Sequence, residues 1–401
     1  MVTEYVTEAS FDGGLANYTC RIASALSRAG HEPVVFVEAE HSQTIEQKGI
    51  KVERVGYRRI PWIAFLNIIT LRRLQRFFNY LRKSRNLNAV LKKQHRLAPF
   101  DIVQFTHLGG LGIFRPKDLP AVVRLSSYTP LWQQFGEYAD RSRFQVWQQA
   151  VVEGLALKRA DAVFGPSAQI AGVVQERLAI PVRTLESPFI VAEGPEDDSL
   201  YQNMLAGKRY VLFFGRLNRP KGILVIADFI GKLLRTHPDL FYVFAGKETT
   251  GFSGRPVMEH LHDRAGKCRD RVIYLGRIPQ SQLFPVVRHA AVITFPALIE
   301  NFPNVCLEAM SVGQVIVATH APGFEQLIRD GESGWLCRPH DPGIFLATLE
   351  KALHMDDSER ARMGAAAKKR IAELSPERIT AAHLAFYEEV IATVKRKHLV
   401  K

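Results

Sequence analysis

Two cations follow a predicted buried strand in the second half of the chain. The apolar run 210–214 ends at Gly215, and Arg216 and Lys221 come before the next helical stretch. Cations held at the carboxyl end of a parallel strand can neutralise a diphosphate and stabilise it as a leaving group. A solvated basic loop would contain the same residue types, so this segment by itself leaves both interpretations open.

Two carboxylates lie further along, in the stretch ENFPNVCLEAM. Glu300 opens it, and Glu308 falls within a predicted helix. We expect Asn301 or a neighbour to cap that helix, whose first N–H groups would face an anion. One carboxylate could accept hydrogen bonds from a ribose and the other from sugar hydroxyls. The alternative is a surface glutamate followed by one that the helix dipole favours.

Small and polar residues follow three predicted strands of the first half. Gly13 and Gly14 let a backbone approach a ligand closely, or simply form a tight strand-to-helix turn. His107 follows the strand 101–105, where a structural strand-end histidine is one interpretation. Ser126 follows the strand 121–125.

Strands that alternate with helices position these residues. The chain has 401 residues, of which 47% are hydrophobic and 23% charged, a composition typical of globular proteins. Predicted strands cover 1–5, 33–37, 51–55, 101–105, 121–125 and 162–165, then 210–214, 242–245, 272–275, 291–295 and 315–318. This order predicts an α/β fold of two doubly wound, Rossmann-like domains facing a central cleft.

The loop 187–198, rich in proline and acidic residues, predicts the domain boundary. We therefore expect an N-terminal domain over 1–190 and a C-terminal domain over 191–375. A last helix, within 376–401, is expected to pack back toward the N-terminal domain.

The motifs taken together resemble family 4 of the retaining GT-B glycosyltransferases. The matching segments are FDGGLANYTCRIASALSRAGHEPVVF, FFGRLNRPKG, FAGKE, VIYLGRIP, FPALIENFPNVCLEAMSVGQVIVAT and GFEQLIRDGESGWLCRPHD. The resemblance covers most of the chain but leaves 58–96 outside any motif. It implies the GT-B fold, with an acceptor-binding N-terminal domain and a C-terminal domain that binds a nucleotide-sugar.

The same resemblance implies roles for individual residues. Arg216 and Lys221 would bind the donor diphosphate, Glu308 the ribose, and Glu300 the transferred sugar. The expected catalytic residues are Arg216, Lys221 and Glu300. Backbone N–H groups over 302–305 would meet the sugar or phosphate. The expected donor-binding set is Gly13, Gly14, Gly215, Phe302, Pro303, Asn304, Val305 and Glu308. Many family members have a histidine where Ser126 and its neighbour stand, so a histidine contact at that place is in doubt. The resemblance leaves His107 and Ser126 as candidates for a sugar or acceptor contact, with a structural strand-end histidine as the alternative for His107.

The implied reaction is retaining transfer from a UDP- or GDP-linked sugar to a glycan or lipid-linked acceptor, in polysaccharide or glycolipid biosynthesis. No D-x-D triplet occurs in the sequence, so we expect neither a required metal nor a cofactor. Two alternatives are a sugar-nucleotide epimerase on the same fold and a non-catalytic protein that binds nucleotide-sugars or lipids.

One segment concentrates the positive charge. The formal net charge is +13, and 58–96 contains eleven Lys and Arg but no Asp or Glu. Such a block favours an anionic membrane surface or a lipid diphosphate, unless it forms a helical hairpin with a solvated face. No motif supports nucleic-acid binding. The four cysteines include no C-x-x-C pair, no signal-peptide pattern is present, and the apolar run 61–71 is shorter than the ~20 residues that span a bilayer. We expect a cytoplasmic protein, peripheral on the inner face of the membrane.

Overall fold

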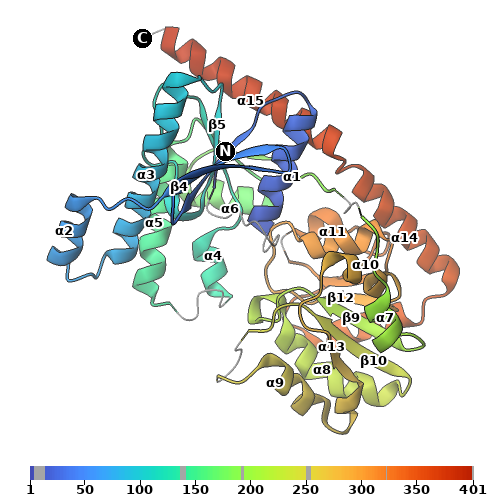
Figure 1. Ribbon diagram of the computed structural model, residues 1–401. Helices are drawn as coiled ribbons and strands as arrows, with labels where there is room; N and C mark the ends of the chain where they lie inside the picture. The colour runs from blue at the N-terminus through green and yellow to red at the C-terminus, as the bar shows by residue number, and fades with distance from the viewer. Residues whose placement is uncertain (4–13, 136–140, 191–193, 250–253, 322, 400–401) are drawn as a thin grey trace. The chain divides into compact units, whose positions relative to one another are not determined.

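The computed structural model describes residues 1–3, 14–135, 141–190, 194–249, 254–321 and 323–399. The chain forms two compact units (Figure 1). Unit 1 comprises 1–134, 138–188 and 374–401, and unit 2 comprises 135–137 and 189–373. The chain therefore contributes most of unit 2 as one continuous segment, 189–373, and returns to unit 1 at residue 374.

Unit 1 is built on an eight-stranded sheet in the order β3-β4-β2-β1-β5-β6-β7-β8. Its strands are β1 (Val2–Thr3), β2 (Val34–Ala39), β3 (Gln43–Gln47), β4 (Ile50–Gly56), β5 (Val103–Thr106), β6 (Ala121–Arg124), β7 (Ala162–Gly165) and β8 (Val182–Thr184). Among the strands that the structure describes in this sheet, only β3 runs antiparallel, to β4. The central strands β5 and β6 are short and buried over their whole length, as a parallel sheet covered on both faces requires.

The helices of unit 1 are α1 (Gly14–Arg28), α2 (Pro61–Ile69), α3 (Gln75–Leu97), α4 (Thr129–Gln134), α5 (Arg143–Arg159), α6 (Ala168–Leu178) and α15 (Pro376–Leu399), with a 3-10 turn η1 (Leu108–Gly110). A capping box of Ser142 and Gln145 begins α5. The last helix, α15, packs on α1, and its Phe386 and Val390 share a buried cluster with Ile22.

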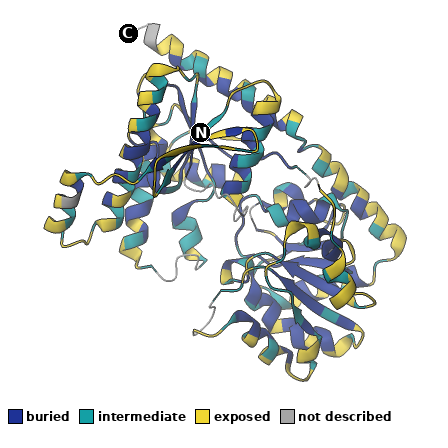
Figure 2. Ribbon diagram, viewed as in Figure 1, coloured by how far each residue is buried: buried dark blue, intermediate teal, exposed yellow. Residues whose placement is uncertain are grey.

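Unit 2 is built on a six-stranded, fully parallel sheet in the order β11-β10-β9-β12-β13-β14. Its strands are β9 (Arg209–Phe214), β10 (Leu240–Ala245), β11 (Val272–Tyr274), β12 (Val292–Phe295), β13 (Ile316–Thr319) and β14 (Trp335–Cys337). Its helices are α7 (Ser199–Met204), η2 (Arg219–Lys221), α8 (Ile223–Thr236), α9 (Val257–Ala265), η3 (Gly266–Arg271), α10 (Gln280–Arg288), α11 (Asn304–Ser311), α12 (Phe324–Leu327), α13 (Pro342–Leu353) and α14 (Asp357–Ala372). Figure 2 shows its strands buried almost throughout.

The predicted α/β class, with two doubly wound sheets, is confirmed in each unit. Three strands escaped prediction: β3, β8 and β14. All lie at sheet edges, and β3 reads QTIEQ, with polar side chains that face solvent and give no apolar run. No helix within the described ranges is both long enough and apolar enough to cross a bilayer.

Candidate active site

The expected donor-binding residues of unit 2 gather where its strand order reverses. From β9 the chain goes outward through β10 to β11, whereas β12, on the other side of β9, leads outward to β14. Ligands of open α/β sheets bind beyond the carboxyl ends of the strands at such a switch point. Gly215 directly follows β9, and Pro296 directly follows β12. The two loops that carry the predicted residues therefore leave the sheet side by side.

The loop after β9 is fixed by its backbone. Gly215 has φ 132° and donates its N–H to Ala245 O over 2.9 Å. Leu217 donates in the same way to Lys247 O, also over 2.9 Å. Asn218 then caps the turn η2 by accepting from the N–H of Lys221. These bonds hold Arg216, which is exposed, at the carboxyl end of the sheet.

The two loops approach so closely that only glycine fits at the contact. Gly222 has φ 77°, and a Cβ built on it would lie 1.7 Å from Pro296 O. Leu298 N donates to Pro220 O over 2.8 Å, which ties the loop after β12 to η2. A side chain at Gly222 would drive the loops apart, so this glycine sets the distance between the predicted cation and carboxylate.

Lys221 and Glu300 form an ion pair across these loops. The Lys221 side chain is 30% exposed and that of Glu300 11%. The pair therefore joins a largely buried carboxylate to a cation that partly reaches solvent. Burial first, and the nearby charge of Glu300 second, raise the pKa of Cys306, which keeps that thiol protonated. The structure thus brings two of the three predicted catalytic residues into contact.

Helix α11 follows Glu300 and directs its first turn toward the same place. Its N-cap is Pro303, and no side-chain hydrogen bond caps this end among the described residues. The expected cap by Asn301 or a neighbour is therefore wrong. A backbone role for Pro303 as a hydrogen-bond donor is also wrong, because proline carries no N–H. The close approach of Gly323, whose Cβ would lie 2.2 Å from Asn301 O, fixes the turn before the helix.

The remaining donor-binding candidates lie around this helix. Asn304 and Glu308 are four residues apart and so share one helix face. Glu308 is buried, and Phe302 and Val305 are half-buried. A Cβ on Gly215 would lie 3.7 Å from Val305 Cγ1, which places the first turn of α11 against the end of β9. The helix N-terminus, the ion pair and Gly215 thus form one neighbourhood.

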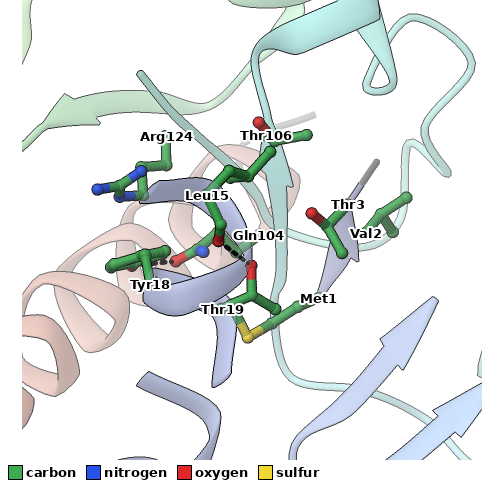
Figure 3. A pocket seen from close by; sticks show the side chains of 9 residues that line it. All are labelled: Met1, Val2, Thr3, Leu15, Tyr18, Thr19, Gln104, Thr106 and Arg124. Carbon is green, nitrogen blue, oxygen red and sulfur yellow. Dashed lines mark hydrogen bonds between the residues drawn. The ribbon is translucent and has the colours of Figure 1, made fainter. Parts of the chain in front are cut away.

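The strand order of unit 1 also reverses, between β1 and β5, and a small pocket lies there (Figure 3). Thr3 and Thr106 end these two strands, and both hydroxyls are buried without a hydrogen-bond partner. Figure 3 shows Tyr18 of α1 and Arg124 of β6 beside them, with the guanidinium carbon of Arg124 3.5 Å from the centre of the Tyr18 ring. Gly14 begins α1, whereas Gly13 lies outside the described residues.

A buried hydrogen-bond network joins this pocket to α15. Gln104 Oε1 accepts from the hydroxyls of Tyr18 at 3.2 Å and Tyr387 at 2.6 Å. Arg124 donates to Ser126 Oγ at 3.0 Å and to Ser187 Oγ at 2.9 Å. Burial raises the pKa of Tyr18 to about 12, so its hydroxyl stays a donor. This network was not predicted from the sequence, although an arginine in the otherwise apolar strand AVVR was a visible signal.

His107 is fully buried and acts within unit 1. Its Nδ1 accepts from Ser126 N over 3.0 Å, and its Nε2 lies 3.4 Å from Ser127 Oγ. Burial, reinforced by the charge of Arg124, lowers the pKa of His107 to about 3. The imidazole is therefore neutral, carries its proton on Nε2, and orients the backbone of Ser126 and the side chain of Ser127. Ser126 itself is half-buried.

No three His, Cys, Asp or Glu side chains gather as metal ligands in the part of the chain that the structure describes. The site consists instead of cations, carboxylates and a helix N-terminus. Such a set can bind a diphosphate together with hydroxyl groups.

Two family models cover most of the chain. Residues 13–185 match a glycosyl transferase 4-like domain, and 201–370 match the glycosyl transferases group 1. The D-inositol 3-phosphate glycosyltransferase of Corynebacterium jeikeium (strain K411) is 32% identical over 181 residues, 44% of this chain and 43% of that protein. That of Thermobifida fusca (strain YX) is 30% identical over 45% and 42%. The matched segment is thus less than half the length of these curated relatives.

Solved structures resemble the chain over nearly its whole length. Sucrose-phosphate synthase from Thermosynechococcus elongatus superposes with a TM-score of 0.76 at 20% identity, over 98% of this chain and 99% of that one. The Anabaena protein HepE, solved in complex with UDP and glucose, gives a TM-score of 0.68 at 16% identity, over 97% and 100%. At these identities the likeness concerns the fold.

Proposed function

Since this chain belongs to the family 4-like glycosyltransferases of the GT-B fold, we propose that it transfers a sugar from a nucleotide-diphosphate sugar to an acceptor. One observation carries the proposal: Lys221, Glu300 and the N-terminus of α11 converge at the switch point of unit 2. The proposed donor is UDP- or GDP-linked, and the HepE structure with bound UDP supports the first. Unit 2 is the proposed donor-binding unit and unit 1 the acceptor-binding unit.

Donor binding exchanges one partner of Lys221 for another. A phosphate oxygen accepts from its ammonium group, joined by Arg216 and by N–H groups of the first turn of α11. Glu300, released from the ion pair, then accepts from a hydroxyl of the transferred sugar. Glu308 accepts from the ribose. Its position four residues after Asn304, on the same face of α11, supports this role.

Departure of the nucleoside diphosphate places negative charge on phosphate and positive character on the sugar ring. Arg216, Lys221 and the helix N-terminus stabilise the first, and each such preorganised donor is worth about 3–4 kcal/mol. These fixed groups would supply what a divalent metal supplies elsewhere, so we propose metal-independent transfer. We also propose retention, with the acceptor attacking the face that the leaving group vacates and the donor phosphate taking the acceptor proton.

The proposed acceptor is a glycan or lipid-linked sugar in polysaccharide or glycolipid biosynthesis. Ser126 is a candidate acceptor contact, and the neutral His107 supports it by fixing its backbone. The basic segment 58–96 supports an anionic membrane surface as a further partner, with the protein peripheral on the inner face of the membrane.

A donor screen tests the proposal. The purified chain is heated with UDP-, GDP- and ADP-sugars, and a matching donor should raise the Tm by mass action. The best donor is then incubated with candidate acceptors, and products are separated by mass and anomeric configuration. Transfer with retention, undiminished by a chelator, supports the full proposal. No stabilisation by any donor, or an epimerised sugar nucleotide without transfer, would contradict it.

A further inference from the structure

Helix α2 exposes apolar side chains where a surface helix ordinarily exposes polar ones. Trp62, Phe65 and Ile69 recur at i, i+3 and i+7 and are 41%, 62% and 59% exposed. Ile68 lies within the same arc and is 69% exposed, whereas Ile63 on the opposite side is buried in unit 1. The outward face of α2 is therefore apolar, a pattern that marks a contact surface rather than a solvated helix.

A second exposed apolar feature of unit 1 is a pair of aromatic side chains on α5. Phe144 and Trp147 are both about half exposed and stack with their ring centres 5.5 Å apart. The neighbouring Gln148 accepts from the N–H of Phe77 and donates to the carbonyl of Arg73. These bonds hold the start of α3, and with it the turn after α2, beside the aromatic pair.

Cations bracket the apolar face. Arg58 and Arg59 precede α2, Arg72 and Arg73 follow it, and all four are exposed. Trp62 lies under Arg85 of α3, whose guanidinium carbon is 5.8 Å from the ring centre. The other exposed cations of the segment are Lys92, Lys93 and Arg96.

Arg82 does not belong to this set. It is buried and binds Glu38 through two hydrogen bonds of 2.6 and 2.9 Å, which anchors α3 to the sheet. Arg82 thus holds α3 in place. The exposed cations of 58–96 leave the surface of α2 and α3 strongly positive.

We propose that α2, the turn that follows it and the aromatic pair of α5 form an insertion surface for an anionic membrane. This surface is defined by Trp62, Phe65, Ile68, Ile69, Leu71, Phe144 and Trp147. The apolar side chains enter the acyl region, the tryptophans lie at the interface, and the bracketing arginines bind lipid phosphates. An anionic bilayer is the partner that complements both features, because a nucleic acid would leave the apolar arc in water. The inference deepens the membrane partner of the proposed function, yet docking requires no nucleotide-sugar.

Vesicle binding tests the proposal with the full chain and without donor, so its outcome is independent of transfer. Vesicles of phosphatidylcholine alone are compared with vesicles that contain about one third phosphatidylglycerol, at 0.1 and 0.5 M salt. We expect binding to the anionic vesicles, weakened but not abolished by the higher salt, because insertion contributes beside charge. Absence of binding to anionic vesicles would overturn the proposal and leave donor binding untouched.

Two pairs of variants separate insertion from charge. Phe65→Gln/Ile68→Gln should lower the bound-to-free ratio at least about tenfold, a change that corresponds to only ~1.4 kcal/mol. Its control is Met204→Gln/Ile344→Gln, two similarly apolar exposed positions of unit 2, which should bind as the unmodified chain does.

The charge pair is Arg58→Gln/Arg59→Gln, expected to weaken binding about tenfold at 0.1 M salt and less at 0.5 M. Its control, Lys267→Gln/Arg269→Gln, removes two exposed cations from unit 2 and should have little effect. Equal losses in test and control pairs would assign binding to net charge alone and contradict a specific surface.

Fluorescence reports whether the apolar arc enters the bilayer. Brominated acyl chains should quench tryptophan emission of the bound protein, and Trp62→Phe/Trp147→Phe should remove most of that quenching. Binding without quenching would mean adsorption on headgroups and would overturn insertion. A dimer in solution that Phe65→Gln/Ile68→Gln dissociates would also overturn the proposal, since the surface would then be an interface between two copies.

Discussion

The ion pair between Lys221 and Glu300 allows folding and transfer to be separated by substitution. Glu300 is the more buried partner, so Lys221→Met leaves its carboxylate without the cation that compensates its burial. Such a loss costs about 1–3 kcal/mol, discounted toward the lower value because Lys221 is 30% exposed. For a unit of this size we expect the Tm to fall by roughly 2–4 °C per kcal/mol. Lys221→Met/Glu300→Gln removes both charges and should recover most of that loss.

Transfer should respond differently from stability. Lys221→Met removes a cation from the leaving diphosphate, so kcat should fall about 10²–10³-fold. The double variant should remain as inactive as the single one while its Tm recovers. Both quantities are measured on one preparation, by thermal unfolding and by initial rates of donor turnover. Near-normal turnover in Lys221→Met would refute the assigned role, and additive Tm changes in the double variant would refute the coupling of the pair.

Three further substitutions test the surrounding structure. Gly222→Ala places a methyl group 1.7 Å from the position of Pro296 O and should lower the free energy of unfolding by well over ~2 kcal/mol. Its control is Gly207→Ala, at φ 74° but in open space, which should lower it by only about 1 kcal/mol. Denaturant unfolding measures both. His107 is neutral in the folded protein and binds a proton in the unfolded one below pH ~6.5, because burial lowers its folded pKa to about 3. The free energy of unfolding should therefore be about 2 kcal/mol lower at pH 5 than above pH ~6.5 on account of this residue. His107→Asn should reduce that dependence in a pH series of unfolding curves. Tyr387→Phe deletes a buried hydroxyl that donates a hydrogen bond to Gln104, and it should lower the free energy of unfolding by about 1 kcal/mol. The affinity for the nucleotide-sugar, measured by titration calorimetry, should not change.

The central strands were predictable because burial on both faces forces continuous apolar runs such as 210–214 and 315–318. The edge strands were not, since β3 pairs through its backbone while its side chains remain polar. The charge of 58–96 was visible in the sequence. Which of its cations are exposed and which is buried in an ion pair was not. Only the fold shows that Arg82 is bound to Glu38 on β2, a pairing across 44 residues that composition cannot reveal.

Motif spacing located the loops of the candidate site, and strand order explains why they meet. Lys221 and Glu300 are 79 residues apart, and their contact depends on β9 and β12 being neighbours in the sheet. That adjacency is a property of topology, not of local sequence. The missing side-chain cap of α11 was equally invisible, because Asn301 is a good capping residue by type but lies before Pro303, which takes the N-cap position.

If unit 2 binds the proposed donor, the ion pair provides a way for one site to accommodate both a diphosphate and a neutral sugar. Without donor, Lys221 compensates the charge of the buried Glu300 carboxylate. When a phosphate binds Lys221, Glu300 loses that partner as a sugar hydroxyl becomes available to it. Charge is therefore redistributed within the site rather than newly buried, which keeps the desolvation cost of binding low. On this reasoning Glu300→Gln should weaken the binding of a nucleotide-sugar, because the sugar hydroxyl loses its carboxylate acceptor. The affinity for the corresponding nucleoside diphosphate should not fall, because Lys221 no longer has to leave an ion pair. Equal losses for the two ligands in titration calorimetry would contradict the exchange.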